Sequence, residues 1–240
     1  MVDIEILPLE LSEFRFTDSA LADRRGVVMG YVVRHPDGVL LFDTGFGFGN
    51  ADLDETYAPV GRPILELLRE VGVEKDEITE VVNCHLHADH AGQNSAFAGA
   101  RIHVQSAEWE VAHTTDHTVL EWIDAPGTTY LLIDGDHEIT PAIRVIATPG
   151  HTPGHQSLAV DTDAGTVVLA GQACYTVGEW VGDPDALEGR SNAPDQSAYD
   201  RSIERLRELD PVRVHFGHDR AVWTADPARP STPAILPGPC

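Results

Sequence analysis

Alternating apolar and polar positions, interrupted by turn-forming residues, predict short β-strands from the start of the chain. Residues 2–8 alternate and predict an edge strand, whereas residues 26–34 form a nearly continuous apolar, β-branched run that predicts a buried strand. A turn follows at residues 35–38 (H-P-D-G), because proline at its second position and glycine at its fourth favour one. Residues 39–42 then predict the returning strand of a hairpin.

The rest of the chain mixes strand and helix patterns. Apolar runs bounded by turn-forming residues predict further strands at residues 81–84, 101–104, 128–133, 143–147, 156–160, 166–171 and 212–216. Helical spacing of apolar residues predicts helices at residues 63–71, with Pro63 as the first helical residue, and at residues 107–112 and 194–209. Strands followed by a helix occur in both halves, so the pattern indicates an α/β protein.

Length and composition set the expected domain organisation. A chain of 240 residues with 42% hydrophobic residues can bury a substantial core, and we expect one domain over residues 1–226. Residues 227–240 are rich in proline and predict an irregular C-terminal tail. The first residues lack a basic segment followed by an apolar one, and no window is long enough for a membrane span. We therefore expect a cytoplasmic protein.

Charge and cysteine content exclude several classes of protein. The formal net charge of -23 disfavours binding to nucleic acids or anionic membranes, since phosphate groups would be repelled. The three cysteines are odd in number and lack C-x-x-C spacing, which argues against a disulfide framework and against a thiolate zinc site. Cys84 is expected to be a small buried residue.

Four potential metal ligands lie within six residues directly after the predicted strand 81–84. They are His85, His87, Asp89 and His90, in the pattern H-x-H-x-D-H. In an extended chain, side chains two residues apart project to the same side, so the first two histidines can converge. If a helix begins near residues 91–94, Asp89 and His90 can face a second point. Imidazole and carboxylate together suit zinc, iron or manganese rather than calcium, and strand-end hydrogen bonding alone does not explain such density.

A second candidate segment is residues 148–155, T-P-G-H-T-P-G-H, which follows the predicted strand 143–147. Proline restricts the backbone and glycine permits close approach, so the repeat predicts a rigid loop. A rigid loop at a strand end can supply the third ligand to a centre formed by His85 and His87, and we assign that role to His151. His155 is expected to orient another side chain or to have a structural role.

Three weaker signals each have a purely structural interpretation as well as a functional one. Asp43 ends the predicted strand 39–42 and either stabilises its own turn or orients a metal-binding histidine. Residues 45–49 (G-F-G-F-G) do not form a G-x-G-x-x-G motif; they predict a flexible loop that carries Phe46 and Phe48 near a pocket. A loosely spaced polar group is more typical of the surface than of a metal site, and its members are His113, Asp116 and His117.

The motifs H-L-H-A-D-H, T-P-G-H and F-G-H-D resemble the metallo-β-lactamase superfamily from about Gly26 to His218, and within it the lactonase-type members that open N-acyl homoserine lactones. The resemblance implies an αββα sandwich with the site at one edge. It implies that one metal is bound by His85, His87 and His151, and the other by Asp89, His90 and His218. It also implies that Asp43 orients a metal-binding histidine without contacting the metal itself.

One position departs from the family pattern. The resemblance implies a bridging aspartate after a strand that ends in Ala-Gly, but this chain has Gln172 there. An amide supplies one weak neutral oxygen, whereas a carboxylate supplies a charge and two oxygens, so Gln172 is an uncertain ligand. The tyrosine expected three residues later is present as Tyr175, which faces the substrate carbonyl in the lactonase group.

These features predict a zinc-dependent hydrolase, with one or two zinc ions and with iron or manganese as possible replacements. The expected reaction is attack of a metal-bound hydroxide on a lactone or related ester, in which Tyr175 stabilises the oxyanion and Asp89 manages the proton. The expected partner is a small-molecule substrate, and the protein is expected to be a monomer or homodimer. Alternatives are a glyoxalase II-type thiolesterase, a mononuclear iron persulfide dioxygenase and a non-catalytic metal-binding homologue.

Overall fold

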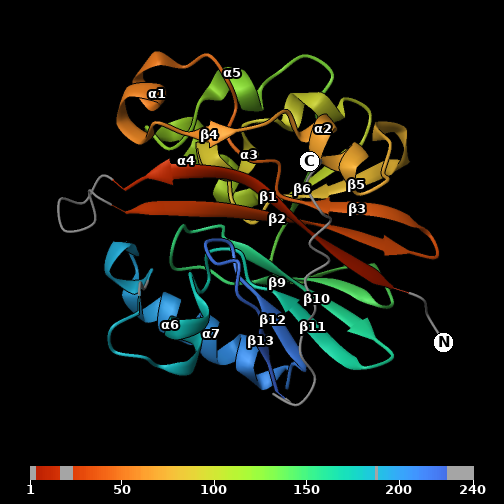
Figure 1. Cartoon of the computed structure of the whole chain (residues 1–240), viewed down its shortest axis with the longest axis vertical. Coiled ribbons are helices and arrows are strands. Elements are labelled where there is room, and N and C mark those ends of the chain that lie inside the picture. Colours follow the sequence, from red (N-terminus) through yellow and green to blue (C-terminus); the bar gives the residue numbers. More distant parts are fainter. Residues whose placement is uncertain (1–3, 17–23, 187–188, 226–240) are drawn as a thin grey trace, which may run out of the picture.

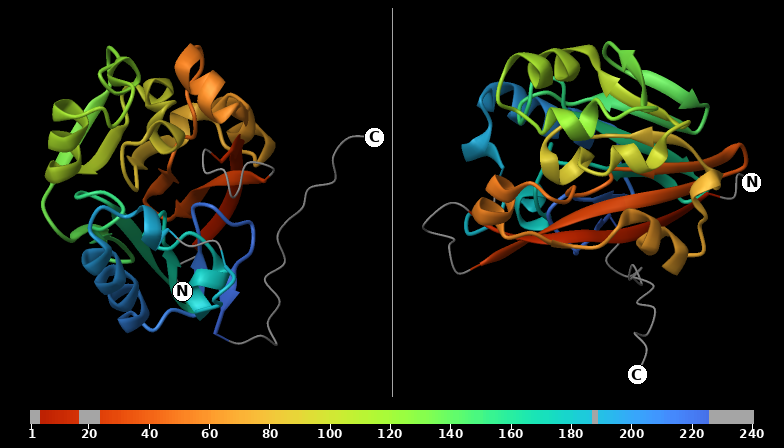
Figure 2. Two further views of the ribbon diagram at one scale, coloured as in Figure 1. Left: turned by 90° about the vertical axis from the view of Figure 1, so that its left-hand side faces the viewer. Right: turned by 90° about the horizontal axis from the view of Figure 1, so that it is seen from above.

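The computed structural model describes residues 4–16, 24–186 and 189–225, and it consists of two β-sheets packed face to face (Figure 1). Helices lie on the outer side of each sheet, so the predicted αββα sandwich is confirmed (Figures 1 and 2). The predicted tail at residues 227–240 lies outside the described residues. Among the described residues, no helix combines the length and apolar character needed to cross a membrane.

The larger sheet has seven strands and the smaller has six. In spatial order the larger contains β4 (Val60–Gly61), β1 (Glu5–Arg15), β2 (Arg25–His35), β3 (Gly38–Phe42), β5 (Ile78–Val82), β6 (Arg101–Gln105) and β7 (Thr129–Ile133). The smaller contains β13 (Trp223–Thr224), β12 (Arg213–His215), β11 (Gly165–Leu169), β10 (Gln156–Thr162), β9 (Ile143–Ala147) and β8 (His137–Thr140). Strands β3, β5, β6 and β7 are parallel, as are β11 and β12.

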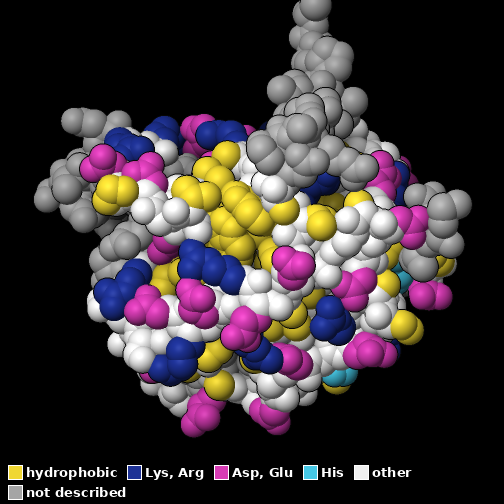
Figure 3. Space-filling view, turned by 90° about the horizontal axis from the view of Figure 1, so that it is seen from below, with side chains coloured by type: hydrophobic (Ala, Val, Ile, Leu, Met, Phe, Trp, Pro, Cys, Tyr) yellow, Lys and Arg dark blue, Asp and Glu magenta, His cyan; other side chains and the backbone are white. Residues whose placement is uncertain are grey.

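The helices divide between the two outer faces (Figure 1). On the side of the larger sheet lie α1 (Ala51–Tyr57), α2 (Ile64–Glu70), η2 (Lys75–Glu77), α3 (Ala88–Ala91), η3 (Asn94–Phe97), α4 (Ser106–Thr114) and α5 (Leu120–Ile123). On the side of the smaller sheet lie α6 (Val177–Val181), η4 (Arg190–Asn192) and α7 (Gln196–Glu208). Seen from below, that face shows acidic and basic side chains interspersed, with a group of hydrophobic side chains among them (Figure 3).

The core has three layers, which explains why β2 and β3 have nearly continuous apolar sequences. Val33 and Phe42 face the other sheet, whereas Val32 and Leu41 face the helices. All four are fully buried, because a strand with packed layers on both sides has no polar face. A separate cluster joins the smaller sheet to α6 and α7, and α7 contributes Tyr199, Ile203 and Leu206 from one face.

Several predicted elements have different bounds in the structure. The edge strand expected at residues 2–8 is part of the longer β1, whose far half pairs with β4 at Ser12 and Glu13. Strand β5 begins and ends earlier than predicted, and Pro63 is the N-cap of α2 rather than its first residue. Local sequence patterns do not predict α1, α6 or β8, because these elements are short and their patterns are weak.

Hydrogen bonds tie the two sheets together at one edge of the sandwich. The Gln156 N–H donates to the Cys84 carbonyl at 2.8 Å, and the Met29 N–H donates to the Gly217 carbonyl at 2.8 Å. The Gly217 N–H donates to the Gly171 carbonyl at 2.9 Å. The segments that follow β5, β9, β11 and β12 therefore meet at this edge, and all the predicted metal ligands lie on them.

Candidate metal centre

Three histidines from two separate segments bring ring nitrogens together. His87 Nδ1 lies 2.8 Å from His85 Nε2 and 3.2 Å from His151 Nε2. Neighbouring nitrogens of a tetrahedral zinc lie roughly 3.3 Å apart when the Zn–N bonds are about 2.0–2.1 Å. One proton can satisfy only one of these nitrogen pairs, whereas a cation satisfies all three nitrogens. The three-histidine group, defined as His85, His87 and His151, therefore fits a metal ion.

Burial keeps the imidazoles of the three-histidine group neutral, which is the form that binds a metal. Burial and the neighbouring His117 lower the pKa of His87 to about 4. Burial and the surrounding imidazoles also lower the pKa of His85 and of His151 well below the ordinary value. Neutral imidazole is the form that ligates a metal, so no proton has to leave at pH 7.

A helix that begins earlier than expected separates the two halves of the H-x-H-x-D-H motif. His87 is the N-cap of α3, so Asp89 and His90 lie in the first turn of this helix rather than before a helix near residue 91. The helical rotation turns these two side chains away from the direction of His85 and His87. The ligand atoms of His85, Asp89 and His90 nevertheless lie within 4.8 Å of one another, so the two halves of the motif remain adjacent.

The second point lies between Asp89, His90 and His218. Asp89 Oδ2 is 3.3 Å from His90 Nε2 and 3.9 Å from His218 Nε2. His218 Nδ1 donates to the Val27 carbonyl at 2.7 Å, which leaves its Nε2 lone pair facing Asp89. Burial opposes ionisation of Asp89, but the neighbouring histidines His90, His218 and His87 together hold the pKa of this carboxyl below its usual range.

Asp43 supports both the motif and its backbone. Its Oδ1 accepts the Cys84 N–H at 2.8 Å, and its Oδ2 lies 2.9 Å from His90 Nδ1. Asp43 adopts a φ of 65°, a left-handed conformation that is uncommon for a residue with a side chain. The strained turn after β3 thus places a buried carboxylate next to Nδ1 of His90. Burial also raises the pKa of the Cys84 thiol, which disfavours a thiolate ligand.

The repeated T-P-G-H sequence forms a loop held between two helices. A Cβ atom at Gly150 would lie 2.4 Å from the Tyr199 backbone nitrogen of α7, and one at Gly154 would lie 2.2 Å from the Glu108 backbone nitrogen of α4. Only glycine permits these approaches. The loop is therefore immobilised on both sides, which holds His151 in place.

His155 has a structural role, one of the two that its position suggested. Its Nε2 accepts the Gln172 N–H at 2.9 Å, and its Nδ1 lies 3.1 Å from the Thr148 carbonyl. Both ring nitrogens are thus engaged, so this histidine has no lone pair left for a metal. Its effect is to position the backbone of Gln172.

Gln172 lies at the predicted bridging position and lines the pocket beside the histidines. Its side-chain Oε1 is buried and has no hydrogen-bond partner among the described residues. A buried amide oxygen without a partner is unfavourable unless a ligand or water satisfies it. The glutamine therefore carries a neutral acceptor without a partner in the wall of the pocket that holds the histidines.

Tyr175 places a hydroxyl next to the three-histidine group. Its Oη lies 3.4 Å from His151 Nδ1, and its backbone N–H donates to Glu179 Oε2 at 2.6 Å. Burial, followed by the charge of Asp89, raises the pKa of Tyr175 above its ordinary value. The hydroxyl is therefore protonated at neutral pH and can donate a hydrogen bond.

These residues open into a pocket of about 690 Å³. One wall is apolar and contains Phe14, Phe16, Phe46, Leu53 and Tyr57. The prediction for the glycine-rich segment holds for Phe46 only, because Phe48 is 55% exposed and does not line the pocket.

The surface assignment of His117 is wrong. Its side chain is only 9% exposed, and its ring packs on His87 at a centroid distance of 4.2 Å. No local pattern marks this contact, because it joins the segment after α4 to the H-x-H motif. Asp116 is exposed but also lines the pocket, whereas His113 pairs with Asp124 outside it.

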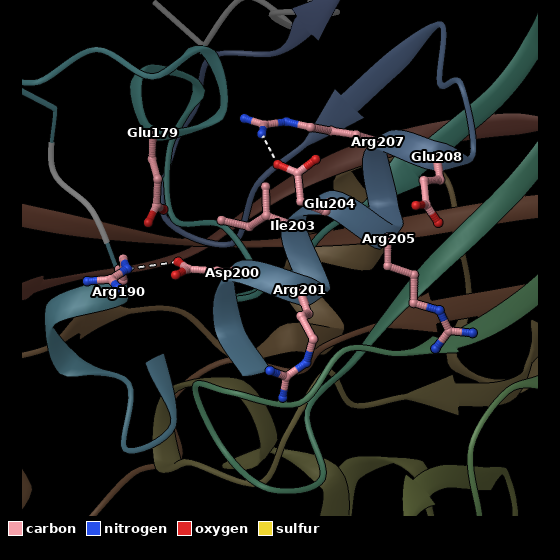
Figure 4. Close-up of a pocket in the computed structure, with 9 residues that line it drawn as sticks. All are labelled: Glu179, Arg190, Asp200, Arg201, Ile203, Glu204, Arg205, Arg207 and Glu208. Atoms are coloured by element: carbon pink, nitrogen blue, oxygen red, sulfur yellow. Dashed lines mark hydrogen bonds and ion pairs between the residues drawn. The ribbon is translucent and has the colours of Figure 1, made fainter. Parts of the chain in front are cut away.

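A second hollow of about 690 Å³ lies on α7, so volume alone does not identify the site (Figure 4). It is lined mainly by charged side chains that pair with one another, such as Arg190 with Asp200 and Arg207 with Glu204. It lacks histidine and cysteine among the described residues that line it. The histidine-lined pocket is therefore the candidate centre.

Comparison with known proteins identifies the family and several relatives of this chain. A family profile described as Metallo-beta-lactamase superfamily matches residues 23–218. A Bacillus cereus N-acyl homoserine lactonase is 34% identical over 202 residues, which are 79% of this chain and 80% of that protein. A Bacillus sp. N-acyl homoserine lactonase is 38% identical over 166 residues, but the match spans only 62% of its length and 65% of this chain.

Solved structures show the same similarity in three dimensions. A B. thuringiensis AiiA variant with N-decanoyl-L-homoserine bound at the active site is 30% identical, with a TM-score of 0.74 over 90% of this chain and 93% of that one. An N-acyl homoserine lactone hydrolase with its product N-hexanoyl-L-homoserine at the catalytic metal centre has the same identity, TM-score and coverage. These chains resemble the present one in sequence and in fold.

Proposed function

Because this chain belongs to the metallo-beta-lactamase superfamily, we propose that it is a metal-dependent hydrolase that opens the ring of N-acyl homoserine lactones. The observation that carries the proposal is the convergence of the three-histidine group, Asp89 and Tyr175 on a single pocket. The names of the two Bacillus relatives, both N-acyl homoserine lactonases, favour this substrate class.

The proposed metal is zinc, at two sites. The three-histidine group would hold one ion, and Asp89, His90 and His218 would hold the other, with Asp43 supporting His90. Bound zinc would supply Lewis acidity, which polarises the lactone carbonyl and lowers the pKa of water. Metal analysis of the purified protein distinguishes this proposal from the iron dioxygenase alternative, for which one iron per chain is expected.

Tyr175 and Asp89 would then have separate roles in hydrolysis. The neutral Tyr175 hydroxyl donates a hydrogen bond to the carbonyl oxygen as negative charge develops there. The ionised Asp89 carboxylate accepts a proton from the attacking water and returns it to the leaving alkoxide. Cleavage of the ester C–O bond opens the ring, and the product is a hydroxy acid whose new carboxyl group releases its proton to solvent at neutral pH.

The side chains of the pocket suit a neutral substrate, because they offer no cationic group to an anionic one. Four acidic residues line it, and none of the described lining residues is lysine or arginine: the acids are Asp52, Asp89, Asp116 and Glu121. An N-acyl homoserine lactone is uncharged, and its acyl chain can pack on the wall formed by Phe14, Phe16 and Phe46. A glutathione thiolester carries carboxylates, and none of the described lining residues is a lysine or arginine that could bind them, which disfavours the thiolesterase alternative.

The experiment that tests this function is a direct product assay on zinc-loaded protein. N-hexanoyl homoserine lactone should gain one water, as measured by mass spectrometry, and protein treated with a chelator should lose the activity and regain it with zinc. S-lactoylglutathione serves as the anionic comparison and should be turned over far more slowly. Turnover of the thiolester alone, or no zinc-dependent ring opening, would reject the proposal.

Gln172 leads to a prediction about the second metal. With a neutral amide in place of a carboxylate, repulsion between two divalent cations is less well compensated. We expect the natural protein to bind its second zinc more weakly than its first. Gln172→Asp should tighten the second site by at least about tenfold, because ligand charge increases affinity for a cation.

A zinc titration against a chromophoric chelator, with stoichiometry from native mass spectrometry, measures this difference. Gln172→Asn is the matched control, since asparagine has the shape of aspartate without its charge, and it should leave the second site weak. Two equally tight sites in the natural protein, unchanged in Gln172→Asp, would show that charge at this position does not control occupancy.

A further inference from the structure

One buried carboxylate lies behind the three-histidine group and has no part in the proposed chemistry. Glu108, in the first turn of α4, is fully buried. Its Oε1 accepts the Leu86 N–H at 2.9 Å and lies 2.7 Å from His117 Nε2. Its Oε2 accepts the Thr152 hydroxyl at 2.6 Å and the Gly154 N–H at 3.2 Å. A single side chain therefore joins three segments of the chain.

Each of these segments carries or contacts a member of the three-histidine group. Leu86 is the residue between His85 and His87, so its N–H belongs to the backbone that holds both rings. Thr152 directly follows His151, and Gly154 ends the turn that displays it. His117 packs its ring on His87 at a centroid distance of 4.2 Å. The four contacts of Glu108 are thus distributed over the whole group.

We propose that Glu108 is a positioning residue that sets the relative place of His85, His87 and His151, and thereby the affinity of this group for a metal. The inference rests on the proposed metal-dependent function. The backbone geometry supports it independently, because a Cβ atom at Gly154 would lie 2.2 Å from the Glu108 backbone nitrogen. The loop and α4 are therefore in direct contact where the carboxylate joins them.

The chemistry of a carboxylate suits this role better than that of an amide. An ionised carboxylate accepts hydrogen bonds on both oxygens, whereas a glutamine side chain accepts on one and donates from the other. Burial alone would raise the pKa of Glu108, but the hydrogen bonds from His117 and Thr152 lower it, so the group is ionised. In Glu108→Gln, the NH₂ group must face the Leu86 N–H or the Gly154 N–H, and one of these buried donors loses its acceptor.

The consequence for metal binding follows from preorganisation. His87 Nδ1 lies 2.8 and 3.2 Å from the ring nitrogens of His85 and His151, and these atoms belong to segments more than sixty residues apart. Glu108 contacts the backbone on both sides of that gap. Without its four contacts, metal binding itself would have to bring the two segments together. This would make the free energy of metal binding less favourable.

The test compares two buried glutamates that each pair with a histidine. Glu80 is 5% exposed and its Oε2 lies 2.6 Å from His103 Nε2. Its carboxylate also accepts hydrogen bonds from Arg101, and it makes no hydrogen bond to the three-histidine group. Glu108→Gln and Glu80→Gln are compared with the natural protein. The readouts are the zinc dissociation constant, from competition with a chelator, and the unfolding temperature in excess EDTA.

We expect Glu108→Gln to bind zinc about 10- to 100-fold more weakly, as is typical when a group that orients metal ligands is lost. Glu80→Gln should bind zinc like the natural protein, although both variants should lower the unfolding temperature in EDTA. Equal zinc affinity in Glu108→Gln and Glu80→Gln would overturn the inference while leaving the proposed function intact. A natural protein that binds no zinc would overturn both.

A milder variant covers the case in which Glu108→Gln does not fold. Thr152→Val keeps the shape of the side chain and removes only its 2.6 Å hydrogen bond to Glu108. It should weaken zinc binding several-fold, in the same direction and to a smaller extent. Unchanged zinc affinity in folded Thr152→Val would count against a positioning role for the carboxylate.

Discussion

Replacement of His151 by alanine is expected to lower lactone turnover by at least about a thousandfold, because a metal that is lost cannot activate the carbonyl or the water. His151 Nε2 lies 3.2 Å from His87 Nδ1, and without it the three-histidine group retains two nitrogens. Zinc bound per chain should fall at the same time. Elemental analysis and a lactone assay at saturating substrate measure the two effects.

The fold should survive this change, since the loop around His151 is held by other contacts. The Glu108 carboxylate anchors Thr152 and Gly154, and Ser202 of α7 donates to the Pro149 carbonyl at 2.7 Å. His113→Ala is the matched control, because His113 pairs with Asp124 away from the pocket. It should retain zinc and activity. Full turnover in His151→Ala would remove this residue from the metal centre.

Tyr175→Phe is expected to lower kcat by roughly ten- to a thousandfold, the range for loss of one hydrogen-bond donor to a developing oxyanion. Its hydroxyl lies 3.4 Å from His151 Nδ1 and is protonated at neutral pH, because burial raises the pKa of Tyr175. Zinc affinity should change much less than kcat, since the hydroxyl contacts one proposed ligand, His151, only at the long distance of 3.4 Å. Steady-state kinetics and zinc titration separate the two quantities.

Tyr57→Phe provides the comparison within the same pocket. Tyr57 also lines the pocket, as part of its apolar wall. Its ring packs on Phe46 at a centroid distance of 6.1 Å. The loss of this hydroxyl should affect KM more than kcat. An unchanged kcat in Tyr175→Phe would make Tyr175 a packing residue and leave the oxyanion to other groups.

Local patterns in the sequence determine much of the sandwich. Residues 26–34 and 39–42 predict strands because most positions are apolar and several are β-branched, and in the structure Val32, Val33, Leu41 and Phe42 are buried on both sides of the sheet. The spacing of His85 and His87 likewise places two ligands on one side within three residues, which needs no information from elsewhere in the chain. Short elements such as α1 and β8 were missed because so few residues carry a pattern.

Only the tertiary structure decides which distant segments complete the centre and what holds them. The contacts of His151 with His87, of His218 with Asp89 and of Asp43 with His90 join residues that are far apart along the chain. Glu108 and His117 lie in a helix and the segment after it, and nothing in their local sequence distinguishes them from surface residues. Their role arises because packing brings α4 against the T-P-G-H loop, and such packing depends on the whole core rather than on neighbouring residues.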